Sequence, residues 1–155
     1  MAYQIDQSGK VEQTNKDTVL CLANGNLDTI FIKAGVKRQL QEIFRRNGQP
    51  RNYVLFTFCA ALSLLLKRNL SIGRIIIDKE YFGKEAIIKE ILLEMMEENR
   101  DKIIIEFGII GKRVNAHIKG YQVYKGKRNP EKVLNQEAIL KEIKKTEVGK
   151  QLKNT

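Results

Sequence analysis

Residues 74–80 read Arg-Ile-Ile-Ile-Asp-Lys-Glu, an apolar run that ends in two acidic residues. Three consecutive isoleucines bounded by Gly73 predict a strand buried on both faces of a sheet, because a strand with one solvated face alternates apolar and polar residues. A helical pattern begins at about Lys84. The run therefore predicts an α/β protein with Asp78 and Glu80 at a strand end, where open sheets form ligand crevices. The same two acids are also explained if the strand simply ends in solvent.

Four further strands are predicted from short apolar runs on both sides of this one. Three of them precede it and are separated by turn residues, which predicts an antiparallel meander; they span Tyr3–Asp6, Thr18–Leu22 and Thr29–Ile32. A fifth strand is predicted within 102–111 and is closed by glycine. The order predicts a mixed five-stranded sheet whose last two strands run parallel through right-handed βα crossovers.

Apolar residues at helical spacing predict helices between and after these strands. The segment Tyr53–Arg68 is apolar nearly all round, which predicts a central helix packed on the sheet. The other helical segments span about 36–46, 84–98, 115–124 and 135–145. The polar end of the chain, 147–155, is expected to fray.

Length and composition predict one globular domain with an aliphatic core, because the chain has 155 residues, of which 43% are hydrophobic. Its 28 Lys and Arg residues outnumber 18 Asp and Glu residues and give a net charge of +10. A surplus of this size favours polyanionic partners, nucleic acid above all. A basic protein rich in Lys, Glu and Ile is also typical of hot environments, so the charge has an alternative explanation.

The spacing of the cysteines and the absence of several motifs disfavour some classes of protein. Cys21 and Cys59 lie in apolar runs without CxxC spacing, which disfavours zinc sites and disulfide frameworks and fits a reducing cytoplasm. The first residues lack a signal-peptide pattern, and Thr57 and Ser63 interrupt the longest apolar segment. A cytoplasmic protein without membrane contact is therefore expected. No phosphate-binding loop, dinucleotide fingerprint or nucleophile elbow occurs in the sequence.

The order of the predicted elements, with Asp6 on the first strand and Asp78 on the fourth, resembles the ribonuclease H-like fold. Ribonuclease H, retroviral integrases, Holliday-junction resolvases and many transposases share this fold. The segment Tyr3–Gly9 is similar to its opening strand, in which an apolar residue precedes a catalytic Asp and a small residue closes the turn. The resemblance covers about residues 1–125. It implies a ribonuclease H-like domain over 1–128, followed by a C-terminal helical extension and polar tail over 129–155.

The resemblance also implies a site at one edge of the sheet. Catalytic roles would fall to Asp6, Asp78 and His117, the chain's only histidine, which lies where the last helix of the pattern brings an Asp or His. Asp6, Asp78 and Glu80 would bind Mg²⁺ or Mn²⁺, hard cations that prefer oxygen ligands. The activity implied is metal-dependent hydrolysis of phosphodiester bonds in nucleic acid.

Each site residue also has a structural explanation that the sequence leaves open. Asp6 could bond backbone amides in the turn that follows it, and Asp78 or Glu80 could pair with a lysine. His117 could cap or pack at a helix start. The corresponding alternative functions are a non-catalytic nucleic-acid-binding module on the same fold and a structural or assembly protein.

Basic and aromatic residues supply candidates for contacts with nucleic acid. The basic candidates are Lys37, Arg38, Arg45 and Arg46 before the central helix, and Lys112 and Arg113 just after Gly111. They are alternatively ordinary surface charges. The candidates for base stacking, whose alternative place is the core, are Tyr53, Tyr81, Phe82, Tyr121 and Tyr124.

Overall fold

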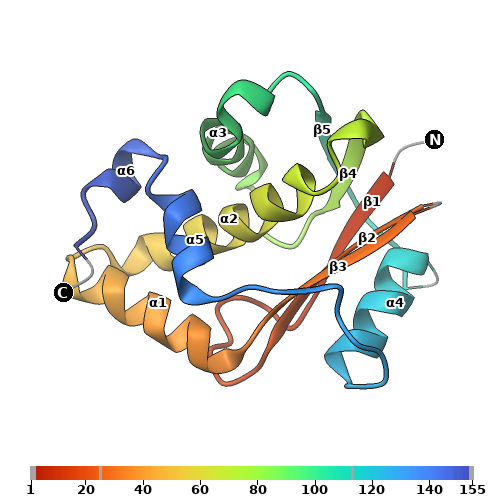
Figure 1. Ribbon diagram of the computed structural model, residues 1–155, viewed down its shortest axis with the longest axis horizontal. Coiled ribbons are helices and arrows are strands. Elements are labelled where there is room, and N and C mark those ends of the chain that lie inside the picture. The colour runs from red at the N-terminus through yellow and green to blue at the C-terminus, as the bar shows by residue number, and fades with distance from the viewer. Residues whose placement is uncertain (1–2, 25, 113, 154–155) are drawn as a thin grey trace.

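The computed structural model describes residues 3–24, 26–112 and 114–153, which form a mixed β-sheet with helices on both of its faces (Figure 1). Within these residues the sheet has six strands in the order β5-β4-β1-β2-β3-β6. The strands are β1 (Tyr3–Ser8), β2 (Thr18–Asn24), β3 (Asn26–Ile32), β4 (Arg74–Asp78), β5 (Ile104–Gly108) and β6 (Lys132–Val133). The α/β class and the mixed sheet predicted from the sequence are confirmed.

The strand pairing brings the ends of β1 and β4 together. The first three strands form the predicted antiparallel meander, with β1 paired to β2 and β2 paired to β3. The chain then crosses over, so that β4 runs parallel to β1 on its other side and β5 runs parallel to β4. Because these three strands are parallel, their carboxyl ends lie at one edge of the sheet, where α/β proteins bind ligands.

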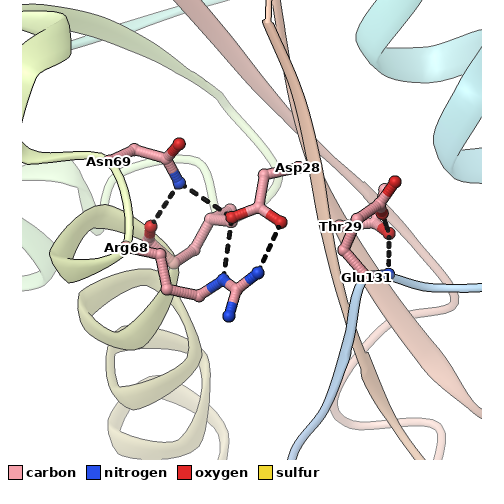
Figure 2. Close-up of polar contacts among 6 residues, drawn as sticks. Asp28, Thr29, Arg68, Asn69 and Glu131 are labelled. Atoms are coloured by element: carbon pink, nitrogen blue, oxygen red, sulfur yellow. Dashed lines mark hydrogen bonds and ion pairs between the residues drawn. The ribbon is translucent and has the colours of Figure 1, made fainter.

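The sixth strand, β6, corrects the prediction of a five-stranded sheet. It runs parallel to β3 and its two residues are exposed, so neither length nor hydrophobicity marks it in the sequence. Side-chain bonding secures it: the backbone amide of Glu131 donates to Thr29 Oγ1 at 3.0 Å, and that hydroxyl donates to the Glu131 carboxylate (Figure 2). The buried Leu134 follows, and its amide bonds the carbonyl of Phe31.

The helices divide unequally between the two faces of the sheet (Figure 1). On one face, α2 (Tyr53–Lys67) contacts β2 and β3, while α1 (Ala34–Arg46), α3 (Glu85–Met96) and α5 (Gln136–Ile143) pack against α2. On the other face, α4 (Asn115–Tyr124) contacts β1 and β2. All five predicted helices occur, and α2 is central, as its apolar sequence indicated.

The aliphatic core lies on the α2 face of the sheet. Alternation along β1 sends Ile5 into this core with Leu20 and Leu22 of β2, while Asp6 and Ser8 face α4. Burial of an aliphatic side chain contributes roughly 1.5–3 kcal/mol, so the core supplies most of the stabilisation. The opposite face is left free to carry polar groups beneath α4.

The end of the chain is ordered as far as residue 153, which corrects the expectation of a frayed tail over 147–153. The short α6 (Glu147–Lys150) is capped by the Thr146 hydroxyl, which accepts a hydrogen bond from the amide of Gly149. Leu152 is buried in the core, and Asn47 bonds the backbone of Lys153. Together with Val148, which also packs against the core, Leu152 docks this polar segment.

Cys21 and Cys59 are free and buried, as their apolar surroundings indicated. Burial raises the pKa of the Cys21 thiol to about 12 and raises that of Cys59 further. Neither thiol is therefore a ready nucleophile at neutral pH. Among the described helices, none combines the length and the apolarity that crossing a bilayer would require.

Asp28→Ala is expected to destabilise the protein by about 2 kcal/mol, because it leaves a cluster that joins β3 to the end of α2 without its acceptor. The buried Asp28 carboxylate accepts from Arg68 at 2.8 and 3.1 Å and from Asn69 at 2.9 Å (Figure 2). Urea unfolding measures the loss. Glu42→Ala, which removes a half-exposed pair with Arg45 on α1, serves as the control and should cost less than about 1 kcal/mol.

Candidate metal centre

Strand register places Asp6 and Asp78 side by side. β1 and β4 pair in parallel with Tyr3 opposite Ile75 and Ile5 opposite Ile77, so the next residue of each strand is Asp6 and Asp78. Neighbours at the same register position point to the same face of a sheet. The two carboxylates therefore share the α4 face at the carboxyl ends of their strands.

Glu80 joins this pair through the turn that follows β4. The amide of Lys79 donates to the carbonyl of Gly108 at 2.9 Å, and the amide of Glu80 donates to the carbonyl of Asp78 at 2.9 Å, which turns the chain at the strand end. Each carboxyl group of Asp6, Asp78 and Glu80 offers one oxygen, and these three atoms lie within 4.8 Å of one another. The structure thus brings together the three residues that the resemblance named as metal ligands.

His117 lies over Asp6, with its Nδ1 2.8 Å from Asp6 Oδ2. The approach of α4 to the sheet makes this contact possible. Asp6 pairs with Cys21 of β2, and a Cβ on Gly120 would lie only 3.0 Å from the Cβ of Cys21. Because Gly120 has no side chain, α4 packs closely enough for the histidine almost one turn earlier to reach the carboxylate.

A second bond fixes the loop between β5 and α4. The backbone amide of Ile110 donates to Asp78 Oδ1 at 2.8 Å, and the Ile110 side chain is buried. Asp78 therefore touches the loop that leads into the helix carrying His117. One carboxylate thus ties the end of β4 to the loop that follows β5.

The surroundings of Asp6 and Glu80 favour the protonated form of these two carboxyl groups. Asp6 is 4% exposed, and its burial raises its pKa, against a lowering by the hydrogen bond to His117. Partial burial, together with the hydrogen bond and charge of Asp78, raises the pKa of Glu80 to about 7. Near pH 7 Glu80 therefore carries its proton part of the time, and a bound cation would relieve the same repulsion.

A pocket of about 270 Å³ opens beside the cluster. Its walls come from the turn after β1, the turn after β4 and one side of α4, and its lining residues are Gln7, Ser8, Gly9, Lys10, Gln13, Glu80, His117, Tyr121 and Tyr124. Gly9 is required at the first of these turns: its φ is +74°, and a Cβ there would lie 2.0 Å from the carbonyl oxygen of Asp17.

Two contacts hold the loop 9–17 in place at this edge. The carboxylate of Asp17 accepts from the amide of Ala34 at the start of α1, at 2.8 Å. The hydroxyl of Tyr81 donates to Glu12 at 3.0 Å, which links the loop to the turn after β4. The floor of the pocket is therefore built from segments that the fold fixes on both sides.

Lys37 does not belong to a nucleic-acid surface, and its prediction as a contact residue is wrong. Its side chain is 0% exposed. The ammonium donates to the carbonyls of Lys10 and Gln13 at 3.1 and 2.8 Å and to the hydroxyl of Thr18 at 2.9 Å. A lysine on an amphipathic helix looks exposed in sequence, but here two carbonyl oxygens of the loop after β1 and one hydroxyl of β2 surround its ammonium.

The other predicted basic residues lie apart from one another. Arg38 is exposed near the start of α1 and donates to the carbonyl of Thr14 in the loop 9–17. Arg45 and Arg46 lie at the far end of α1, which runs towards the C-terminus (Figure 1), and both face Glu42. They are not close to the carboxylates. Lys112 is exposed in the loop between β5 and α4, and Arg113 lies outside the described residues.

Further acids do not join the cluster. Glu106 of β5 is held by Arg74 through two hydrogen bonds of 2.6 and 2.9 Å. Glu42 is occupied by the arginines of α1. The group that meets at the sheet edge among the described residues consists of Asp6, Asp78 and Glu80.

Sequence reasoning missed the part played by Lys10 and Gln13, because no pattern marks the residues of a loop that folds back over a strand end. It named Tyr121 and Tyr124 but did not join them to His117. Helical spacing offered that signal: the three residues are at positions i, i+4 and i+7, which share one side of a helix.

Glu80→Gln is expected to change how the stability of the metal-free protein depends on pH. The folded protein keeps the Glu80 proton up to about pH 7, whereas the unfolded chain releases it near the ordinary glutamate pKa of 4.5. Stability from this group is therefore present below about pH 4.5 and lost as pH rises through about 7. In EDTA at about pH 8, the variant should be more stable than wild type by about 1 kcal/mol, after allowance for partial exposure of Glu80.

The measurement is urea unfolding at several pH values between about 4 and 8. At the acidic end the variant and the wild type should differ little, since both carry a neutral group. Glu90→Gln, at an exposed position on α3, controls for loss of a surface charge. A pH-independent difference between Glu80→Gln and wild type would contradict the assignment.

Comparison with known proteins gave no match to this chain among protein-family models, curated proteins or solved structures.

Proposed function

We propose that this protein is a divalent-metal-dependent nuclease, or a related phosphoryl-transfer protein, that acts on nucleic acid. The observation that carries the proposal is the convergence of Asp6, Asp78 and Glu80 at the carboxyl ends of β1 and β4, with His117 bonded to Asp6. Carboxylates held this close lower the stability of the fold, because each raises the energy of the charged form of its neighbours. Such an arrangement is therefore typical of functional sites.

The topology supports a ribonuclease H-like fold as part of this proposal. The strand order β5-β4-β1-β2-β3, with β2 antiparallel to its neighbours, and the acids on β1 and β4 are what the resemblance implies. α4 brings His117 to the same edge, as the last helix of that pattern would. The strand β6 and the segment after it are additions to the pattern.

The donor set fits a hard divalent cation. In octahedral coordination with bonds of about 2.1 Å, neighbouring ligand oxygens are about 3 Å apart and opposite ones about 4 Å. The carboxylate oxygens of Asp6, Asp78 and Glu80 lie within 4.8 Å of one another, so small side-chain rotations would bring them to that spacing. Oxygen donors select Mg²⁺ or Mn²⁺ over softer metals. Bound there, the cation would activate water and stabilise charge on a phosphate.

His117 is the candidate for proton transfer. When its Nδ1 donates to the Asp6 carboxylate, the Nε2 atom is left as an acceptor. His117 also lines the pocket beside Glu80, where a scissile phosphate would enter. The Asp6 carboxylate would thus orient the ring, and the ring would accept or return a proton at the reacting oxygen.

Positive charge near the pocket supports nucleic acid as the substrate class. Lys10 lines the pocket, Lys112 is exposed in the loop before α4, and Lys125 is exposed just after α4. Together with the net charge of +10, these lysines would attract phosphates and release counterions on binding. At the carboxylates themselves a phosphate would be repelled until a cation is present, whereas the lysines would attract the rest of the strand with or without metal.

The experiment combines thermal unfolding with cleavage assays. Wild-type protein is heated in EDTA, Mg²⁺ or Mn²⁺, and is incubated with single-stranded and duplex DNA, RNA and DNA–RNA hybrid. The proposal predicts a rise in melting temperature with Mg²⁺ or Mn²⁺ and cleavage that requires the same ion. If the melting temperature does not rise with either ion and none of these substrates is cleaved, the nuclease is excluded. Salt-dependent binding without cleavage would identify a non-catalytic nucleic-acid-binding module instead.

A further inference from the structure

We propose that the substrate segment that reaches the metal centre is unpaired, and that one of its bases stacks on an aromatic stripe formed by His117, Tyr121 and Tyr124. This inference rests on the proposed function, since it names the form of nucleic acid that the same site would accept. It commits to single strands, flaps, loops or frayed ends rather than to the interior of a duplex.

The stripe is a continuous row of rings along one side of α4. The rings of His117 and Tyr121 are nearly parallel, with an interplanar angle of 15° and centroids 6.3 Å apart. Tyr121 and Tyr124 follow at 6.2 Å with an angle of 33°. The row begins at the histidine bonded to Asp6, so it leads directly away from the carboxylates.

These rings are not core packing. Tyr53 is 1% exposed, and Tyr81 packs edge-on against Phe58 with centroids 5.0 Å apart, as expected for aromatic residues in a core. Tyr121, by contrast, is 46% exposed, yet it lies between two other rings. Tyr121 thus combines solvent exposure with a place in an ordered row of rings, and the charged neighbour over its ring is the flexible side chain of Lys125.

One pocket joins the stripe to the metal centre. His117, Tyr121 and Tyr124 form one wall, and Glu80 and Lys10 contribute to the others. The cavity of about 270 Å³ is near the lower end of the range for ligand sites, which suits a nucleotide rather than a helix of nucleic acid. A base on the stripe would leave its phosphate within reach of the carboxylate-bound cation.

The charges around the stripe match a nucleotide strand. Lys125 Nζ lies 5.6 Å from the centre of the Tyr121 ring, and Lys10 lies on the pocket wall. A strand that crosses α4 would therefore meet cations for its phosphates and ring faces for its bases, the combination typical of single-strand binding. Within a duplex both faces of each base are already covered by its neighbours, so only unpaired bases can use the stripe.

The test separates binding from cleavage by working in EDTA. Fluorescence anisotropy measures the affinity of wild type, Tyr121→Ala, Tyr121→Leu and Tyr121→Phe for a short single-stranded oligonucleotide. We expect roughly 10-fold weaker binding for the Ala and Leu variants, because a stacked base is lost, and near wild-type binding for Phe, which keeps the ring. The position is half-exposed, so the variants should fold, and circular dichroism checks this.

Two further arms decide between base and backbone recognition. For an oligonucleotide of the same length with abasic positions, wild type and Tyr121→Ala should bind with the same affinity. A blunt duplex should bind less tightly than the single strand at equal salt. If Tyr121→Phe loses as much affinity as Tyr121→Ala, or if removal of the bases leaves the affinity unchanged, base stacking on the stripe is excluded.

Failure of this inference is distinguishable from failure of the nuclease. Metal-dependent cleavage of duplex that Tyr121→Ala leaves unchanged would overturn the stripe and retain the nuclease. Single-strand binding that depends on Tyr121, without cleavage in Mg²⁺ or Mn²⁺, would support the stripe and overturn the nuclease.

Discussion

Asp78→Asn is expected to abolish stabilisation by Mg²⁺ and Mn²⁺ and to lower cleavage by at least about 100-fold. Asp78 contributes to the raised pKa of Asp6 and of Glu80, which shows that its charge acts on both of the other carboxyl groups. Asparagine keeps the size of the side chain and an oxygen that can accept from the amide of Ile110. The substitution therefore removes charge from the centre without removing the bond that fixes the loop before α4.

The same substitution should raise the stability of the metal-free protein, because repulsion on Asp6 and Glu80 falls. A gain of about 1 kcal/mol in EDTA is expected at neutral pH, in the opposite direction to the loss of metal binding. This pair of opposite effects distinguishes a metal centre from a structural cluster. An acid that only supported the fold would destabilise the protein in EDTA when replaced.

Thermal unfolding in EDTA measures the gain in stability of the metal-free protein, and the same measurement in Mn²⁺ measures the loss of stabilisation by metal. Single-turnover cleavage measures the fall in activity. Glu106→Gln is the matched control, since Glu106 lies on the adjacent strand but is held by Arg74. It should leave the response to metal unchanged. If Asp78→Asn keeps the wild-type rise in melting temperature with Mn²⁺, Asp78 is not a ligand.

The sequence predicted β4 well, because three isoleucines leave little choice of structure and Gly73 and Asp78 bound them. It could not by itself predict that Asp6 lies beside Asp78. Strand order is a property of the crossover connections, which periodicity does not encode, so the adjacency came from the resemblance. The position of Glu80 depended further on a turn of two backbone hydrogen bonds.

Two other parts of the fold were not predicted, for identifiable physical reasons. β6 is two exposed residues long and depends on the bonding between Thr29 and Glu131, which are far apart in sequence. The tail after α5 docks through Val148 and Leu152, and two apolar residues in a polar segment are too few to give a clear periodic signal. In each case the deciding contact is tertiary, and local pattern carries no information about it.

Lys37 is the clearest example of this limit, and its replacement should have the largest effect on stability. Lys37→Met is expected to cost about 3 kcal/mol, because it leaves the carbonyls of Lys10 and Gln13 and the hydroxyl of Thr18 without their shared donor. Burial lowers the pKa of Lys37 to about 8, so the buried charge is itself unfavourable and offsets part of this cost. The loss still dominates, since the three acceptors stay behind while methionine fills only the volume.

Urea unfolding at about pH 7 measures this loss, with Lys16→Met at an exposed position of the same loop as the control. The sign of the pH dependence gives a second check. Between about pH 8 and the ordinary lysine pKa of 10.5, the unfolded chain binds the proton more readily than the folded protein does. Lys37 therefore makes wild-type stability rise with pH in this range, and the variant should lack that rise.

Because Lys37 holds the loop that carries Lys10 and Gln13, Lys37→Met should also weaken the stabilisation by metal. A variant as stable as wild type would mean that water satisfies the loop oxygens and that the fold, rather than this lysine, positions the pocket.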